Sequence, residues 1–396
     1  MIDPLLALRT EFPILARTNY LVSNSLGAMP RAAADQLGEY ARAWSERGVR
    51  AWADGWWGMP VSVGDEIAPL IGAAAGEVAM VPNVTMAHAA VLSALDFSPP
   101  RDTIVMTALD FPSVRYVAER MAPRLGARVV TVPTEDGITI AEEALLDAID
   151  ERTRLVAVSH VLFKSAFIMD AGAIVRRAHA AGALAMLDTY HSVGVMPVDV
   201  RTIGADFVAG GVLKWLCGGP GAAFLYASAA ARERFAPALT GWQAHARPFA
   251  FEPQMEHAGG AWRWLTGTPP IPSLYAAIEG PRVVRRAGME RVRAKSTRQT
   301  HALIAAADAR GWRVNAPRDD ARRGGTVALD VPHAYEVSQA LLARDVLVDY
   351  RPDAGIRVAP HFYTRDEEVD AALGAIDEIL AQEEWRRFVG ARGVVT

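Results

Sequence analysis

Two charged residues, Asp188 and Lys214, follow apolar runs that have the character of buried strands. Asp188 ends the run "ALAMLD", and Lys214 follows "DFVAGGVL". A desolvated lysine becomes a neutral amine that can form a Schiff base. A nearby carboxylate can keep a pyridine nitrogen protonated, and pyridoxal phosphate needs both groups. The alternatives are a surface lysine whose stem covers apolar neighbours and an aspartate that only caps a turn.

The positions of these two residues depend on a repeated strand and helix order between Glu77 and Tyr226. Seven β-branched runs predict strands at 77–82, 102–107, 127–132, 153–160, 183–188, 206–211 and 222–227. Amphipathic stretches at 113–125, 141–150 and 171–182 predict helices. This order is typical of an α/β fold with a mostly parallel sheet covered on both faces. Ligands of such sheets bind beyond the carboxyl ends of the strands, where we expect Asp188 and Lys214 to meet.

The pattern changes after Pro269 and predicts a small C-terminal α+β domain. A helical tract runs from about Ser273 to Arg310. It is followed by strand-like "GGTVALDV", helical "AYEVSQALLARD", the short runs "VLVDY" and "GIRVAP", and a terminal helix at 365–388. A chain of 396 residues exceeds the usual size of one core, so a large domain with a smaller companion is expected.

Composition argues against several classes of protein. Hydrophobic residues make up 51% of the chain and charged residues 22%, as in a globular protein with a large core. The net charge of −4 and the lack of a basic run argue against a nucleic-acid partner. We find no signal-peptide core or membrane span, which favours a cytoplasmic enzyme. One cysteine, Cys217, and no HExxH pair leave no metal motif.

A cofactor phosphate also needs a cradle, and "PNVTMAHAAVLSAL" offers one. Asn83 and Thr85 are capping-type residues between a predicted strand and an apolar helix, so backbone N–H groups there are suited to an anion. An ordinary helix cap is the alternative. In "DFPSVRY", Phe111 is placed to lie against a planar ring or to pack in the core.

The chain resembles the kynureninases, which are class V members of the fold-type I pyridoxal-phosphate enzymes. The resemblance is carried by "NSLGAMPRAA", "NVTMAH", "DFPSVRY", the stretch from His160 to Tyr226, "TGWQAHARPFAFE", "GTPP" and "GIRVAP". It implies the fold-type I transferase fold with an N-terminal arm at 1–30 that joins the small domain. The large domain at 31–280 would bind pyridoxal 5'-phosphate, and the small α+β domain would cover 281–396.

The resemblance also implies a set of site residues. Lys214 would form the Schiff base, Asp188 would pair with the pyridine nitrogen and His191 would lie beside the cofactor. Arg357 would grip the substrate's α-carboxylate with its planar fork. Further cofactor contacts are implied for Val84, Thr85, Phe111, Ser159, Trp242 and Thr268, and substrate contacts for Asn24 and Trp52.

A homodimer with active sites at the interface follows from the same resemblance. Trp242 and Thr268 would come from the second subunit. The tryptophan-rich stretch with Trp52, Trp56 and Trp57 would shape the substrate pocket across the interface, or would pack in the core.

Three aliphatic residues depart from the kynureninase pattern. Leu213 stands where kynureninases usually carry tyrosine, Val114 where they carry aspartate and Leu162 where they often carry asparagine. Tyr190 either replaces the missing hydroxyl or simply packs. Loss of these polar groups affects proton transfer more than cofactor binding, so cofactor dependence is the safer prediction.

The leading predicted reaction is hydrolytic Cβ–Cγ cleavage of L-kynurenine or a related aryl-oxo amino acid to alanine and an aryl acid. The alternatives are another class V reaction (β-elimination as a C–S lyase, transamination or epimerisation) and a non-catalytic pyridoxal-phosphate protein. A cysteine desulfurase is disfavoured because Cys217 lies just after the lysine and not in a small-domain loop, and because the histidine that such enzymes place before the lysine is absent. We expect Cys217 to be a small buried residue.

Overall fold

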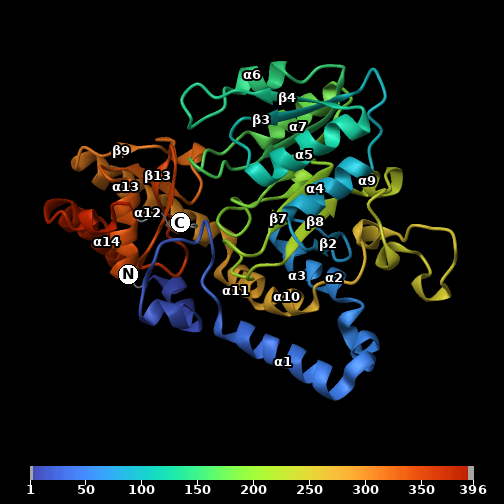
Figure 1. Cartoon of the computed structure of the whole chain (residues 1–396), viewed down its shortest axis with the longest axis horizontal. Coiled ribbons are helices and arrows are strands. Elements are labelled where there is room, and N and C mark those ends of the chain that lie inside the picture. Colours follow the sequence, from blue (N-terminus) through green and yellow to red (C-terminus); the bar gives the residue numbers. More distant parts are fainter. Residues whose placement is uncertain (1–2, 391–396) are drawn as a thin grey trace.

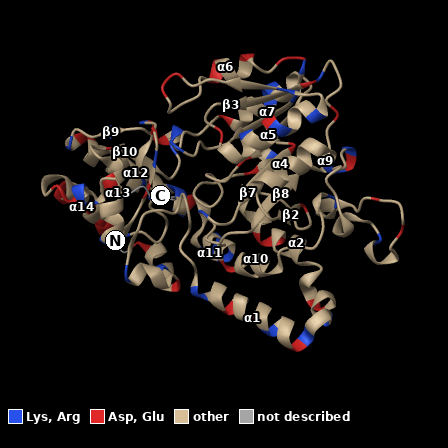
Figure 2. Ribbon diagram, viewed as in Figure 1, with Lys and Arg blue, Asp and Glu red and all other residues tan. Residues whose placement is uncertain are grey.

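The computed structural model describes residues 3–390. It contains a large sheet domain, a smaller α+β domain and an N-terminal segment that lies against the smaller domain (Figure 1). Residues 1–2 and 391–396, the outer ends of the predicted arm and C-terminal domain, lie outside the described residues. Charged residues of both signs are interspersed along the helices of both domains (Figure 2).

The large domain is built on a sheet with the strand order β2-β8-β7-β6-β5-β3-β4. The neighbours β4, β3, β5, β6 and β7 run parallel, whereas β8 is antiparallel to both β7 and β2. The strands are β2 Val78–Val81, β3 Thr103–Thr107, β4 Arg128–Val132, β5 Thr153–Ser159, β6 Leu184–Asp188, β7 Phe207–Gly211 and β8 Ala223–Ala227. All seven predicted strands are therefore confirmed.

Both faces of this sheet are buried because successive strand residues point to opposite sides. Leu184 and Met186 of β6 belong to one hydrophobic cluster, while Ala185 and Leu187 belong to another. The first cluster includes residues of α4 (Val84–Ser93) and α5 (Pro112–Leu125). The second includes residues of α7 (Ala171–Ala180) and α11 (Glu279–Ala287). This explains why the strands read as continuous apolar runs.

The remaining helices of the large domain lie around this layered core. The long helix α1 runs along the lower edge of the molecule in Figure 1. The bounds are α1 Arg31–Arg47, α2 Met59–Ser62, α3 Gly64–Ile67, α6 Glu142–Asp147, α8 Val200–Ile203, α9 Ala229–Arg234 and α10 Ile271–Ala276.

The small domain packs helices against a four-stranded antiparallel sheet with the order β12-β13-β10-β9. Its elements are β9 Arg313–Val314, β10 Val327–Asp330, α13 Ala334–Ala343, β11 Val346–Leu347, β12 Asp349–Arg351, β13 Gly355–Val358 and α14 Asp366–Ala381. The predicted strand "VLVDY" is divided, because β11 pairs with β1 (Asn19–Tyr20) while β12 pairs with β13.

The predicted helical tract at 273–310 is divided into three helices, α10, α11 and α12 (Met289–Ala309). Gly288 has a φ of +80° and separates α11 from α12. Val283 of α11 packs in the core beside the sheet, whereas α12 contributes Val292 to that core and Leu303 to the core of the small domain. Residues of α12 thus pack in the cores of both domains.

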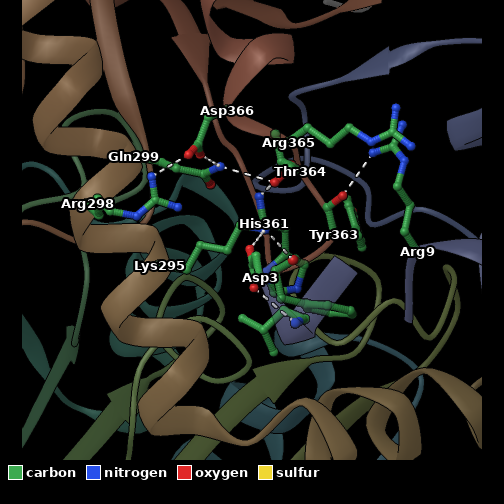
Figure 3. Close-up of polar contacts among 12 residues, drawn as sticks. Asp3, Arg9, Lys295, Arg298, Gln299, His361, Tyr363, Thr364, Arg365 and Asp366 are labelled. Carbon is green, nitrogen blue, oxygen red and sulfur yellow. Dashed lines mark hydrogen bonds and ion pairs between the residues drawn. The ribbon is translucent and has the colours of Figure 1, made fainter. Parts of the chain in front are cut away.

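The N-terminal segment is fastened to the small domain by buried polar contacts (Figure 3). The Lys295 ammonium lies 2.6 Å from an Asp3 carboxylate oxygen and donates to the Phe362 carbonyl at 2.8 Å. Arg9 donates to the Tyr363 carbonyl at 2.8 Å. Phe362 and Tyr363 belong to the segment that follows β13, so these contacts fix that segment in place. The same segment touches the large domain, because His361 Nε2 lies 2.8 Å from the Trp215 carbonyl oxygen.

The helices of residues 3–390 include none that combines the length and the apolar character of a membrane span. Within the same range, no group of three or more histidine, cysteine, aspartate or glutamate residues is placed to hold a metal ion.

Candidate active site

A cavity of about 580 Å³ opens at the carboxyl ends of β5, β6 and β7, between the two domains. This is where ligands bind in parallel α/β sheets. Eighteen residues line it: Asn24, Ser25, Asn83, Val84, Thr85, Met86, Phe111, Ser113, Ser159, Val161, Phe163, Asp188, Tyr190, His191, Leu213, Lys214, Arg351 and Arg357. Asp188 and Lys214, which follow two neighbouring strands, are both among them.

Strand register brings Asp188 to the cavity floor. Ser159 of β5 is paired with Asp188 of β6, which is paired in turn with Ala209 of β7. The side-chain period of two places Ser159 and Asp188 on the face that α4 and α5 cover. Asp188 accepts the Tyr190 backbone N–H at 2.9 Å, and its burial raises the pKa of its carboxyl above the usual range. A cation brought to this carboxylate would therefore be strongly held.

Lys214 lies just beyond β7, with its ammonium pointing into the cavity. The Nζ atom is 2.7 Å from His191 Nε2 and lies over the Phe111 and Tyr190 rings, 5.4 Å and 5.0 Å from their centroids. Burial, with the positive charge of Arg357 as the next cause, lowers the pKa of Lys214 to about 7. Burial also lowers the pKa of His191, so its imidazole stays neutral. The lysine thus has the neutral amine that Schiff-base chemistry requires.

The N-terminus of α4 forms another wall of the cavity. Asn83 caps this helix by accepting the Met86 N–H at 3.1 Å, so the predicted cap is confirmed. Val84 and Thr85 follow the cap and line the cavity. Their backbone N–H groups belong to the first turn, where no intrahelical acceptor exists, and they are suited to an anionic group.

Arg357 reaches the cavity from β13 of the small domain and is almost fully buried. Its Nε donates to Asp349 Oδ1 at 2.8 Å, Nη2 contacts Asp349 Oδ2, and Nη1 donates to the Phe163 carbonyl at 2.6 Å. Asp349 and Arg357 stand directly opposite each other on β12 and β13. This bidentate pair fixes the guanidinium plane while other N–H groups stay available for a carboxylate.

Arg351 adds a second guanidinium to the same wall. It is half-buried and lies 3.1 Å from Asp349 Oδ2. Asp349 therefore shares one negative charge between two arginines. The cavity wall has an excess of positive charge, which suits anionic ligands.

The cavity has the features that pyridoxal phosphate needs, and Asn24 supplies an independent indication of a ligand. Asn24 is fully buried on the cavity wall, and neither atom of its side-chain amide has a partner within residues 3–390. Buried polar atoms without partners are costly, so an amide of this kind indicates a polar ligand. Lys214 for an aldehyde, Asp188 for a ring nitrogen and the α4 N-terminus for a phosphate complete a fitting set of groups.

Three of the predicted contact residues lie outside this cavity. Trp52 packs at the edge of the core against Trp56, with their ring centroids 5.5 Å apart. Trp242 is 43% exposed, and Thr268 lies in an exposed turn. The nine other predicted site residues, Asn24, Val84, Thr85, Phe111, Ser159, Asp188, His191, Lys214 and Arg357, all line the cavity.

The residues that depart from the kynureninase pattern occupy different environments. Leu213 lines the cavity. Val114 and Leu162 are buried in the two hydrophobic clusters and do not line it, although Ser113, Val161 and Phe163 beside them do. Cys217 is buried as expected, and burial raises the pKa of its thiol to about 12. A thiol in this state is unreactive.

Asp349 and Arg351 are functional candidates that the sequence argument did not identify. The sequence signal is a hairpin: "DYR" and "GIR" flank Pro352, Asp353 and Ala354, which are typical turn residues. Antiparallel pairing across this turn places Asp349 opposite Arg357.

Comparison with known proteins identifies a family. A family model described as aminotransferase class-V matches residues 20–370. Kynureninase from Burkholderia pseudomallei (strain 1106a) is 35% identical over 401 residues, which cover 97% of this chain and 94% of that protein. Kynureninase from Pseudomonas fluorescens is 35% identical over 400 residues with the same coverage.

Solved structures with low sequence identity share the fold. A cysteine desulfurase from Thermococcus onnurineus NA1 has a TM-score of 0.84 at 22% identity, over 96% of this chain and 99% of that one. A variant of C-DES with glycine covalently linked to its PLP cofactor has a TM-score of 0.84 at 21% identity, over 93% of this chain and 98% of that one. The predicted fold-type I architecture is confirmed.

Proposed function

The chain belongs to the class-V aminotransferase family, and on this premise we propose that it is a kynureninase-like hydrolase. Enzymes of this family use pyridoxal 5'-phosphate, so the protein is a pyridoxal-phosphate-dependent enzyme. The proposed reaction consumes water and cleaves the Cβ–Cγ bond of L-kynurenine, or of a related aryl-oxo amino acid. The hydroxyl of water joins the Cγ carbonyl carbon to give an aryl acid, and Cβ gains a proton to give alanine.

One observation carries this proposal. Lys214, Asp188 and Arg357 converge on a single cavity in a chain that is 35% identical to kynureninases over 97% of its length. When bound, the cofactor holds the substrate's amino group and draws electrons from its α-carbon. Asp188 would keep the pyridine nitrogen positively charged. Val84 and Thr85 would hold the phosphate with their backbone N–H groups.

Lys214 would move the protons of this reaction. Its lowered pKa leaves much of the amine neutral near pH 7, so the amine can accept the proton from the substrate's α-carbon and return it later. His191, held neutral beside it at 2.7 Å, would orient the amine by accepting a hydrogen bond. Phe111 would pack against the cofactor ring, and Ser159 would contact the cofactor beside Asp188.

Arg357 would set the substrate's orientation. Asp349 and the Phe163 carbonyl hold the guanidinium in place before the substrate arrives, so little freedom is lost when it binds the α-carboxylate. Asn24, whose amide lacks a partner among the described residues, would donate to or accept from the substrate. A substrate without the α-carboxylate should bind much more weakly.

Turnover of L-kynurenine tests the proposal. We expect the pyridoxal-phosphate-loaded protein to release anthranilate, followed by its fluorescence, together with alanine. The Lys214→Ala variant, loaded in the same way, is the matched control and should release neither. Wild-type protein that binds the cofactor but leaves L-kynurenine intact would refute the hydrolase proposal and retain the cofactor assignment.

Leu213 favours a second candidate, another class V reaction on a different amino acid. It lines the cavity with an aliphatic side chain where kynureninases usually carry a tyrosine. C–S β-elimination, transamination and epimerisation use the same lysine, aspartate and arginine groups and differ after the α-proton is lost. A reaction with a persulfide cysteine is disfavoured by the buried, high-pKa thiol of Cys217.

We propose further that the protein is a homodimer whose subunits complete each other's sites. The surface near Trp242 supports this, because Phe249 is 61% exposed and Phe251 is 75% exposed. The Trp242 ring centroid lies 4.8 Å from that of Trp57 and 5.8 Å from that of Phe251. Such an exposed aromatic cluster is typical of an interface centre. Trp242, Thr268 and the stretch around Trp52 would then reach the partner's cavity.

Mixed dimers test this arrangement. A Lys214→Ala subunit keeps Trp242, and a Trp242→Ala subunit keeps Lys214. If Trp242 serves the partner's site, coexpression of the two inactive variants creates one intact site in each mixed dimer. Random pairing should then restore about a quarter of wild-type activity. No restoration, or a monomer by sedimentation, would contradict the proposal.

A further inference from the structure

Tyr190 and Gly211 form a matched pair on the floor of the cavity. The Tyr190 side chain lies across the end of β7, directly over Gly211. A Cβ atom at position 211 would lie 1.9 Å from Tyr190 Cζ and 2.1 Å from its hydroxyl oxygen. These separations are far below van der Waals contact. Gly211 is therefore the residue that leaves room for this phenol.

The pair lies on the reactive side of the sheet. Ala209 of β7 belongs to the cluster that packs against α4, and the period of two places position 211 on the same face. Tyr190 contacts this cluster, lines the cavity and has its ring centroid 5.0 Å from Lys214 Nζ. Its backbone N–H donates to Asp188 at 2.9 Å. The Tyr190 ring thus lies beside the amine of the site, and its backbone is tied to the carboxylate.

The Tyr190 hydroxyl is an uncommitted donor. Among residues 3–390 no hydrogen bond to this hydroxyl is found, and the side chain, which is only partly exposed, lines the cavity. Burial, with the nearby Asp188 charge, raises the pKa of the phenol, so it remains protonated across the physiological range. The other charged or titratable groups on the cavity wall are Asp188, His191, Lys214, Arg351 and Arg357. The neutral Tyr190 hydroxyl among these groups is suited to donate a hydrogen bond, and it carries no charge that could balance theirs.

We infer that the Tyr190 phenol is a hydrogen-bond donor of the active site, held over Gly211 so that it serves the ligand joined to Lys214. The inference deepens the proposed function, because it assigns a donor to the same site, but it requires only that the cofactor binds at Lys214. A donor here stabilises the more negative, deprotonated form of the bound cofactor. It would also position the cofactor and substrate for the lysine.

The Tyr190→Phe variant tests the donor, because it keeps the ring over Gly211 and removes only the oxygen. The first readout is the pH titration of the visible absorbance of the bound cofactor, which needs no substrate. Loss of the donor should move the midpoint to higher pH by about one unit. The second readout is kcat/KM on the working substrate, which should fall about tenfold to a hundredfold. Tyr226→Phe, a buried phenol on β8 outside the cavity, is the matched control and should change neither readout.

Gly211→Ala tests the pairing. The added methyl group must displace the phenol, so this variant should shift the titration midpoint as Tyr190→Phe does. In a Tyr190→Ala background the methyl group has space, and Gly211→Ala should move the midpoint no further. Circular dichroism checks that each variant folds.

The experiments distinguish failure of the Tyr190 inference from failure of the proposed hydrolase function. An unchanged midpoint in Tyr190→Phe would overturn the inference, with or without lost activity. An equal shift from Gly211→Ala in both backgrounds would overturn the pairing. If wild-type protein fails to cleave L-kynurenine, the proposed hydrolase fails, while the titration still decides the role of Tyr190.

Discussion

The lowered pKa of Lys214 makes a quantitative prediction about how the cofactor-free protein captures pyridoxal phosphate. Only the neutral amine attacks the aldehyde, so the capture rate should follow the neutral fraction of Lys214. Burial and the Arg357 charge lower this pKa from 10.5 to about 7. We therefore expect the rate to rise between pH 6 and pH 8 and then to level off.

The size of the effect follows from the two pKa values. At pH 7.5, an amine with a pKa of about 7 is neutral in about three-quarters of molecules, whereas one at 10.5 is neutral in about one in a thousand. The site thus makes the reactive form about 750 times more abundant. Removing the Arg357 charge should raise the pKa of Lys214 and move the rate curve to higher pH.

Stopped-flow absorbance measures this directly. Cofactor-free wild-type protein, Arg357→Gln and Arg357→Lys are each mixed with pyridoxal phosphate between pH 5.5 and 10. Arg357→Lys preserves the positive charge and is the matched control, so its midpoint should stay near that of the wild type. Free pyridoxal phosphate also titrates in this pH range, but equally in all three mixtures. A difference in midpoint between two variants therefore reports the protein.

Two results would contradict a lowered pKa of Lys214 or its dependence on Arg357. A wild-type rate that keeps rising tenfold per pH unit up to pH 10 would mean that Lys214 has an ordinary pKa in spite of its burial. An Arg357→Gln midpoint equal to that of the wild type would mean that the arginine charge is not felt at the amine.

Three further predictions concern the other groups. The Lys214→Ala protein should lose the visible absorbance of covalently bound cofactor, and its persistence by spectrophotometry would contradict the Schiff-base assignment. Asp349→Asn leaves Arg357 buried without its full counter-charge, so we expect a loss of about 3–5 kcal/mol in the free energy of unfolding, measured by urea denaturation. A loss below about 1 kcal/mol would show that the Phe163 carbonyl and water are enough to hold the Arg357 guanidinium. Cys217→Ala should keep wild-type kcat on the working substrate, and complete loss with a normal fold would reopen the persulfide alternative.

Much of the fold could be predicted from local patterns. The seven apolar runs of the large sheet are β-branched and bounded by turn residues, so each strand was identifiable alone. Asp188 and Lys214 could be placed at one site because parallel strands share a carboxyl edge. The cradle at Asn83 was recognisable from a cap followed by a helix.

Other features depend on packing that local sequence does not specify. Val114 lies three residues after Phe111, yet Phe111 lines the cavity while Val114 is buried in the core, because Phe111 is the extended N-cap of α5 and Val114 belongs to its first helical turn. Tyr190 could not be placed before its contact with Gly211 was known, since that contact joins two different strand ends. The division of residues 346–350 between two sheets depends on the N-terminal strand β1, which is distant in sequence.

The proposed hydrolysis is tested most directly by identifying every product that the pyridoxal-phosphate-loaded enzyme forms from L-kynurenine. Hydrolytic cleavage predicts equimolar anthranilate and alanine, both dependent on Lys214. A 2-oxo acid, D-kynurenine, or turnover only of a sulfur-containing amino acid would contradict hydrolytic Cβ–Cγ cleavage and assign the same lysine, aspartate and arginine to a different reaction.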